Sequence, residues 1–418
     1  MEMSETMLKK KRWQSLWGAM AGWTLDAADW MMLALALPLI QKEFGLSLAS
    51  VGLLATVTLA GAAIGGSLVG VVADYLGRVK VLTYTMVWYA IFTAACGFAQ
   101  SFEQLLALRF IVGIGLGGEW GVGAALVSEY WPDKYRARAT SFVHSGWPIG
   151  YGLASLAFMY IVPVSGWRAL FWVGIVPAFI AVAVRLSVPE PQEWVEQNRK
   201  RQEASEKKTE VAKFPLVTLF SGIYLRRTIL GIAFTSATLM AYWGSATWLP
   251  SYLYQAKGLD IVKTGTYLIV LNVGAFFGYQ FLGWVADMKG RRFSFGLAMA
   301  ASIVVTVIYM TLDNPQTLLL FGPVFGFFTY GYFGIFGAFL SELFPVEARA
   351  TGTSFVYNIG RGISMLSPYI IGFVAQAYGL AIGLGTTAAF YVIAMIAIFL
   401  LPETKRESVQ EKAAVAEA

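Results

Sequence analysis

Six ionisable residues lie inside long apolar stretches of this 418-residue chain: Asp26, Asp29, Arg109, Glu119, His144 and Arg361. A charge in hydrocarbon costs several kcal/mol, so such residues normally face a cavity inside the protein. At 1.5 Å per helical residue, four of them lie roughly 13–18 Å from one end of their stretches: Asp26, Asp29, Glu119 and Arg361. That depth is close to the middle of a bilayer, and it predicts a polar site there.

Arg361 is the residue that we expect to bind a substrate. A planar guanidinium binds a carboxylate through two parallel hydrogen bonds, so the predicted ligand is a small organic anion. The alternative is a structural arginine paired with a helix end. Asn358, one turn earlier, could hold a further oxygen of the ligand or pack between helices. Aromatic residues at similar depth could form the cavity wall or contact lipid: Trp30, Trp120, Tyr242, Trp243, Tyr330 and Tyr357.

Proton coupling requires a group that titrates near neutral pH. Burial in an apolar cavity raises the pKa of a carboxyl group, and a nearby cation lowers it. Asp26, Asp29 and Glu119 are therefore the candidate proton carriers, with Asp29 and Glu119 preferred. His144, the one histidine of the chain, could also titrate, but a buried histidine in such a helix more often makes a packing hydrogen bond.

The rest of the composition indicates the membrane in which these charges would lie. The chain is 57% hydrophobic and 13% charged. A soluble domain carries about twice that share of charged residues. A helix needs roughly 20 residues to cross a bilayer. Twelve apolar segments approach this length: 17–40, 51–73, 80–99, 104–129, 139–162, 167–188, 228–250, 264–286, 293–312, 316–341, 351–375 and 381–401.

These segments define the expected organisation of the chain. We expect an all-α membrane protein that begins with a tail (1–16) and a six-helix half (17–189). A linker (190–227), a second six-helix half (228–401) and a tail (402–418) follow.

The positive charges indicate how these helices are oriented. With the N-terminus inside, cytoplasmic segments hold most of the 31 Lys and Arg residues, and few lie in the opposite loops or within helices. This bias predicts a multi-pass protein of the cytoplasmic membrane with both termini and the linker in the cytoplasm. The net charge of +6 then reflects topology, and nucleic-acid binding is excluded.

The two predicted halves contain the same features at one constant spacing in the sequence, so that residue 74 corresponds to residue 287. We call this spacing the repeat offset. Such a repeat indicates an internal duplication. Each second segment ends in a tight loop with the pattern Gly-x-x-x-Asp-x-x-Gly-Arg, and a Ser-Glu pair and a Pro-Glu pair recur at the same offset. The residues are Gly70, Asp74, Gly77, Arg78, Glu129 and Glu190, and then Gly283, Asp287, Gly290, Arg291, Glu342 and Glu403.

Each residue type in this loop motif has a physical role. The glycine before the arginine permits the turn. The aspartate can accept from backbone N–H groups of a neighbouring helix, and the arginine can reach an acid on another helix. Glu129 and Glu342 are the expected acids.

Twelve helices in two pseudo-symmetric halves, with this loop motif in each, resemble the major facilitator superfamily of transporters. Within it the chain resembles metabolite:proton symporters, above all sialate and lactate carriers and the neighbouring aromatic-acid carriers. This second likeness depends on the stretches 25–29, 109–120, 162–171 and 357–361. The resemblance implies that the loop motifs latch the halves in the outward-facing state, and that Arg109 pairs with one first-helix acid while the other carries a proton. Aromatic-acid carriers usually show Asp-Gly-Phe-Asp, where this chain has Asp26-Ala-Ala-Asp29.

The predicted function is import of a small carboxylate such as lactate or pyruvate with protons, by alternating access and as a monomer. An aromatic-acid or sialic-acid symporter and a proton-coupled drug exporter are the alternatives. No cofactor and no enzymatic activity are expected. Residues 113–118 match the dinucleotide fingerprint, but they lie inside a membrane segment with no preceding strand, so their glycines are assigned to helix packing.

Overall fold

The computed structural model describes residues 5–118, 142–175, 219–345 and 349–404, together with residues 131, 139, 179, 190, 195 and 199. Within these ranges the regular elements are helices, without strands. The first group is α1 (Glu5–Phe44), α2 (Leu48–Leu76), α3 (Arg78–Cys96), α4 (Phe102–Leu116) and α7 (Gly146–Val173). The second is α11 (Gly222–Ser251), η1 (Tyr252–Ala256), α12 (Ile261–Lys289), α13 (Arg291–Thr311), α14 (Pro315–Thr329), α15 (Phe333–Glu342), α16 (Arg349–Ser364), α17 (Leu366–Tyr378), α18 (Leu380–Gly385) and α19 (Thr387–Leu400).

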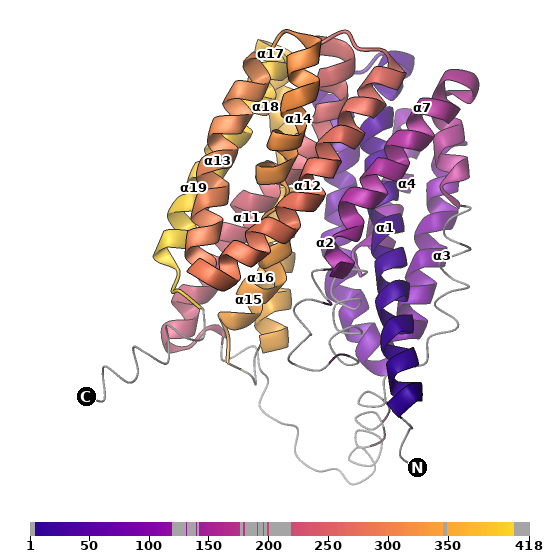
Figure 1. The fold of residues 1–418 in the computed structure, drawn as a ribbon. Helices are drawn as coiled ribbons and strands as arrows, with labels where there is room; N and C mark the ends of the chain where they lie inside the picture. Colours follow the sequence, from indigo (N-terminus) through magenta and orange to yellow (C-terminus); the bar gives the residue numbers. More distant parts are fainter. Residues whose placement is uncertain are drawn as a thin grey trace.

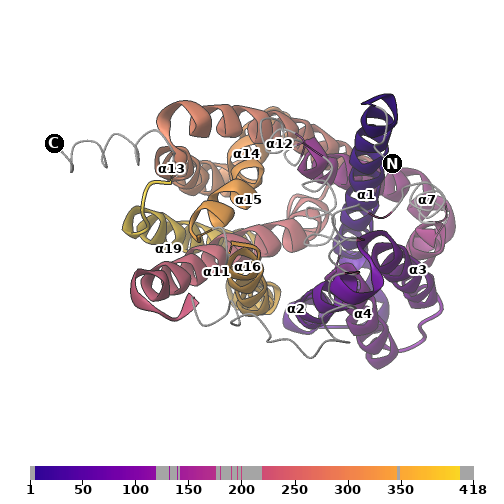
Figure 2. The ribbon, with the colours of Figure 1, turned by 90° about the horizontal axis from the view of Figure 1, so that it is seen from below.

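The two groups form two bundles that stand side by side (Figures 1 and 2). The start of α1 and the end of α19 lie at the same end of the molecule (Figure 1), and these ends of the described chain are the termini referred to below. Nine helices in the described ranges are long and apolar enough to cross a membrane. The predicted fourth, sixth and eleventh spans are not among the nine. The fourth and sixth lie partly outside the described residues, and the eleventh is divided into α16 and α17.

Several helix boundaries differ from the expected ones. Helix α1 begins at Glu5, well before residue 17, and α11 begins at Gly222, inside the expected linker. The predicted fifth and sixth segments run together in α7, which is interrupted by the non-helical backbone of Gly166 at φ 72°. Polar helical residues extend past an apolar core segment, so hydropathy locates the part of a helix in the bilayer better than its ends.

Polar caps begin the helices at the end of the bundle away from the termini. Ser47, Ser101, Asp260 and Asn314 each accept a backbone N–H of the first helical turn that follows them. These caps satisfy backbone donors that have no partner inside the helix. Short capped loops therefore join antiparallel neighbours at this end.

Close contacts between helices occur at equivalent positions of the two halves, related by the repeat offset. In the first half, a Cβ on Gly61, Gly65 or Gly113 would overlap a backbone carbonyl of the facing helix, α4 or α2. In the second half the equivalent residues Gly274, Gly278 and Gly326 do the same between α12 and α14. Small residues let helix backbones approach where lipid provides no hydrophobic drive for association. The duplication therefore extends to the internal packing of each half.

The halves meet at the end opposite the termini through a second pair of equivalent glycines. A Cβ on Gly52 of α2 would lie 2.8 Å from the carbonyl oxygen of Pro368 on α17. A Cβ on Gly265 of α12 would lie 3.1 Å from the carbonyl oxygen of Ser155 on α7, and Ser155 is the equivalent of Pro368. The interface at this end thus follows the symmetry of the repeat. A hydrogen bond between two glutamine side chains, from Gln255 to Gln41 at 2.9 Å, also crosses it.

We predict that Gly52→Val separates α2 from α17, because the added methyl groups would collide with the backbone of Pro368. Overpacking of this kind costs about 1–3 kcal/mol. Spin labels in the loops before α2 and after α17 should move apart, and the thermal unfolding temperature should fall. Gly283→Val is the matched control, since nothing lies within 4 Å of a Cβ at Gly283. An unchanged label distance in Gly52→Val would contradict this role.

Candidate functional site

A central cavity lies between the two halves, with an empty volume of about 550 Å³ that includes open solvent. Its lining comes from α1, residues 144 and 147, α11, α12, α15 and α16, so both halves contribute. Nine lining residues are aromatic, three are ionisable and one is a leucine: Trp23, Trp30, Trp147, Trp243, Tyr242, Tyr279, Tyr357, Phe333, Phe336, Asp26, His144, Arg361 and Leu239.

Helix α1 presents Trp23, Asp26 and Trp30 to this cavity. Their spacing of three and four residues places them on one helix face. Asp26 is 2% exposed, so it is a buried carboxyl group on the wall of an otherwise largely aromatic space. The predicted position of Asp26 near a shared cavity agrees with this geometry.

Asp29 has a different environment from Asp26. An oxygen of Asp29 lies 3.5 Å from Nη1 of Arg109 on α4, and both side chains are almost fully buried. The hydroxyl of Thr93 on α3 donates to the other oxygen of Asp29. Asp29 and Arg109 therefore form an ion pair inside the first half, and neither residue lines the central cavity. Of the two first-helix carboxylates, Asp29 therefore belongs to the interior of the first half, whereas Asp26 lines the shared cavity.

Arg361 reaches the cavity from α16 in the second half and is 6% exposed. Its Nη1 donates to the backbone carbonyl of Gly117 at 3.2 Å, across the interface between the halves. Its guanidinium also lies 5.0 Å from the ring centre of Tyr357, one turn earlier on the same helix. These partners are neutral, so a carboxylate in the cavity would be a stronger partner for this charge.

The other predicted ligand-binding residues are divided between the cavity and its surroundings. Trp30 and Tyr357 line the cavity. Tyr330 lies behind the wall, where it shares a hydrogen bond with Ser245 at 3.2 Å and packs against Tyr242 at 5.0 Å.

Asn358 lies at a helix contact. Its amide donates to the carbonyl of Ser354, and its oxygen lies 2.8 Å from a Cβ built on Gly66, which places it against α2. Trp120 and Glu119 lie outside the described residues.

Two pairs of lining residues follow the duplication, and all four were named from the sequence. Trp30 and Trp243 are equivalent at the repeat offset, and their ring centres lie 4.4 Å apart. His144 is the equivalent of Tyr357, and both line the cavity. Other lining residues were not predicted. Helix-face spacing from Asp26 would have identified Trp23, whereas no comparable signal marked the remaining aromatic residues of the wall, Trp147, Tyr279, Phe333 and Phe336.

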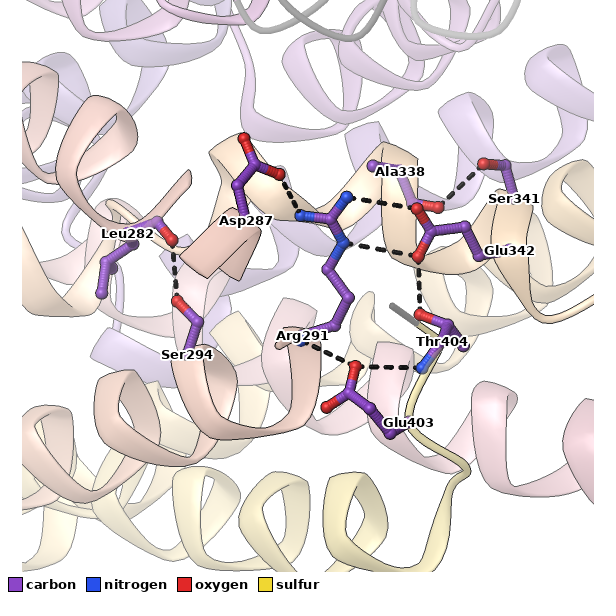
Figure 3. Close-up of polar contacts among 9 residues, drawn as sticks. All are labelled: Leu282, Asp287, Arg291, Ser294, Ala338, Ser341, Glu342, Glu403 and Thr404. Atoms are coloured by element: carbon purple, nitrogen blue, oxygen red, sulfur yellow. Dashed lines mark hydrogen bonds and ion pairs between the residues drawn. The ribbon is translucent and has the colours of Figure 1, made fainter. Parts of the chain in front are cut away.

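The loop motif of the second half forms a polar cluster at the end that carries the termini (Figure 3). Arg291 bonds Asp287 at 2.7 Å and Glu342 at 3.2 and 3.4 Å, and this Glu342 partnership is the predicted one. The hydroxyl of Thr404 donates to Glu342 at 2.6 Å. The cluster thus ties the loop after α12 to the end of α15 and to the residues that follow α19.

A correction concerns the backbone N–H groups at the start of α13. Glu403 accepts them, from Arg291 at 2.8 Å and Arg292 at 3.0 Å, whereas Asp287 was expected in that role. Asp287 instead accepts from the Arg291 side chain, because the guanidinium on the other side of the Gly290 turn offers a charge-assisted bond. The Pro-Glu repeat, to which the sequence analysis gave no role, is therefore the helix cap in this half.

The first half repeats this cap. Glu190 accepts from the backbone of Val79 at 3.2 Å and Lys80 at 3.0 Å. Gly77 and Gly290, at φ 110° and 99°, begin the capped helices, and a Cβ on either glycine would collide with the capping glutamate. The predicted turn role of both glycines is confirmed.

Other members of the loop motifs are described only in part. Glu129, the surroundings of Gly70 and the side chains of Asp74 and Arg78 lie outside the described residues. Gly283, the equivalent of Gly70, has open space around it.

Comparison with known families agrees with this arrangement of two bundles around one cavity. The sequence profile of the Major Facilitator Superfamily matches residues 20–336 and 273–417. The chain belongs to the Major Facilitator Superfamily.

Two relatives and one solved structure extend this superfamily assignment. A protein of Haemophilus influenzae whose name refers to metabolite transport is 38% identical over 395 residues, which cover 94% of this chain and 97% of that protein. The cis,cis-muconate transport protein of Acinetobacter baylyi is 33% identical over 392 residues, covering 92% and 93%. The crystal structure of a D-xylose-proton symporter has a TM-score of 0.76 at 17% identity, covering 94% and 98%, and shares the fold.

As a member of the Major Facilitator Superfamily, the chain is a multi-pass membrane transporter and not an enzyme, with the twelve-helix fold of two pseudo-symmetric six-helix halves. The central cavity lies between those halves, where an arrangement that alternately opens to each side would expose it. A small molecule is therefore the transported substrate class.

We predict that Arg109→Met strongly destabilises the protein, because it leaves the carboxyl group of Asp29 buried without its cation. Removing one partner of a buried pair costs about 3–5 kcal/mol, whereas removing both is often close to neutral. Thermal unfolding in detergent should show a large loss for Arg109→Met and substantial recovery in the double variant Asp29→Asn/Arg109→Met. A double variant no more stable than Arg109→Met would refute the structural role of this pair.

Proposed function

We propose that this transporter carries a small organic carboxylate together with a proton, and that it prefers flat unsaturated or aromatic acids. The observation that carries this proposal is Arg361, a buried guanidinium on the wall of an aromatic cavity that both halves share. Its charge requires an anion, and a carboxylate matches its planar fork. The muconate transporter among the relatives, named for an unsaturated acid, supports the same substrate class.

The lining favours flat acids over lactate and over sugar acids. The wall of the cavity is largely aromatic. Aromatic side chains stack on planar π-systems and exclude water from them, so a flat ligand can use most of this wall. A sialic acid would bring many hydroxyl groups, whose burial without hydrogen-bond partners is costly, and the described lining offers few such partners. Lactate would satisfy Arg361 and leave most of the aromatic surface without a partner.

Asp26 is the group that we assign to the proton. It lines the same cavity as Arg361 and belongs to the opposite half, whereas Asp29 is held by Arg109 and Thr93. This assignment moves the coupling role from the sequence-preferred Asp29 to Asp26. When Arg361 binds a substrate carboxylate and Asp26 is protonated, the net charge at each of these two positions is zero. A carrier with either ligand alone holds an uncompensated charge in a poorly solvated cavity, which opposes the conformational change.

We further propose that the termini face the cytoplasm, following the bias of Lys and Arg residues. The contacts at Gly52 and Gly265 then lie on the external side and close it. In this conformation the cavity would exchange its ligand with the cytoplasm, which is the step that completes import.

Replacing Arg361 tests the substrate assignment. In proteoliposomes with an internal pH indicator, wild-type protein should acidify the lumen when an aromatic or unsaturated acid is added outside, and lipid-only vesicles should define the leak of weak acid. Arg361→Gln should lower carrier-dependent uptake at least about 100-fold, because a charge-assisted bidentate contact contributes roughly 1.5–3 kcal/mol and more when desolvated. Arg361→Lys should recover only part of it, because an ammonium lacks the planar fork.

Uptake that survives Arg361→Gln would remove the substrate assignment. Two results together would favour the exporter. Added acids would cause no carrier-dependent acidification, and lipophilic cations would raise the lumenal pH of acid-loaded vesicles.

Replacing Asp26 tests coupling separately from binding. Asp26→Asn should abolish uphill accumulation driven by a pH gradient while retaining exchange of labelled for unlabelled acid, since the amide cannot carry the proton and Arg361 is intact. The variant should also lose the pH dependence of exchange. Uphill accumulation at the wild-type level in Asp26→Asn would exclude this residue as the coupling group.

A further inference from the structure

Two tryptophans of the central cavity have buried indole N–H groups without an acceptor among the described residues: Trp23 and Trp243. An indole nitrogen can only donate, and a buried tryptophan usually has a partner for it. Trp243 is 6% exposed, so water in bulk does not supply one. An unsatisfied donor of this kind is costly, which makes both groups places where a ligand would bind more tightly.

Five other indoles of the described chain satisfy this requirement within the protein. Their N–H groups donate to a backbone carbonyl, a phenol or a carboxylate: Trp88, Trp131, Trp147, Trp167 and Trp248. The two buried indoles that lack such a partner therefore share one location, the wall of the cavity. Chance burial would not be expected to place both of them there.

Trp23 and Trp243 lie on either side of Trp147, so they belong to one continuous wall. The ring centres of Trp23 and Trp147 are 4.9 Å apart, and those of Trp147 and Trp243 are 5.9 Å apart. Trp147 already donates its N–H to the hydroxyl of Tyr242. Its two neighbours, one from each half of the transporter, hold the buried indole N–H groups of this wall that have no acceptor among the described residues.

We infer that the substrate carries a second, neutral hydrogen-bond acceptor besides its carboxylate, and that the indole N–H groups of Trp243 and Trp23 recognise it. This inference rests on the proposed function, since it takes the carboxylate to be bound by Arg361. Suitable acceptors are a carbonyl or lactone oxygen and an aromatic ring nitrogen. A second carboxylate fits less well, because Arg361 is the one arginine or lysine in the described lining and a further buried charge without a partner is costly.

The test compares ligands that differ in the acceptor alone. Benzoate has none, whereas the pyridine 2-, 3- and 4-carboxylates have the same shape with one ring nitrogen at three different positions. Dissociation constants are measured by competition against a labelled aromatic acid in proteoliposomes. In wild-type protein at least one pyridine isomer should bind about tenfold more tightly than benzoate, because a site built to donate a hydrogen bond discriminates against an analogue that cannot accept it.

Two variants and one matched control assign this preference to the indole donors. Trp243→Phe and Trp23→Phe keep an aromatic ring and remove the N–H, so at least one should reduce the pyridine-to-benzoate ratio to near one. Phe333→Leu removes aromatic area from the same cavity without removing a donor, and it should weaken all four acids equally. The ratio is independent of the fraction of active protein, so a partly misfolded variant still gives an answer.

Equal binding of benzoate and all three isomers to wild-type protein would overturn the inference, as would a preference that survives in both variants. Either result leaves the proposed function standing, because the acids still bind and still require Arg361. Failure of every acid to bind or to acidify the vesicles would instead refute the proposed function itself.

Discussion

The close approach of helix backbones is the constraint on which the rest of this structure depends. Lipid tails are as apolar as leucine, so helices in a bilayer associate through packing and not through hydrophobic burial. Gly61, Gly65 and Gly113, with their equivalents in the second half, remove the side chains that would separate α2 from α4 and α12 from α14. Each half is thereby made compact, and the cavity lies between the two halves.

Charge is placed according to the same division into halves. The pair of Asp29 and Arg109 is completed within the first half and can stay intact while the halves move. Asp26 and Arg361 face a common space from opposite halves, so their surroundings change when the halves separate. The first pair supports structure, and the second supports the proposed coupling of substrate to proton. Two carboxylates three residues apart thus acquire different roles from their neighbours.

Much of this could be predicted from the sequence because a bilayer restricts a chain so strongly. Apolar segment length indicated the helices, and the repeated loop motif indicated the two halves. Asp26 and Arg361 were identified as candidate site residues because a charged side chain in hydrocarbon is costly and normally faces a cavity. The different environments of Asp26 and Asp29 could not be predicted, because helix periodicity does not show which helix packs against each face of the first helix. Tyr330 shows the same limit: it packs against Tyr242, which lines the cavity, and does not line the cavity itself.

The glycine contacts that join the halves at the end away from the termini also affect how easily they can part. Gly52 and Gly265 have no rotatable side chain, and each meets a backbone carbonyl of the other half. Ordering a long side chain at an interface costs up to about 2 kcal/mol of conformational entropy, and glycine incurs none of that cost. The two glycines themselves therefore lose no side-chain rotamers on closure and regain none on opening. At these two positions, the interface therefore adds no cost in side-chain entropy to any movement that brings the halves together or apart.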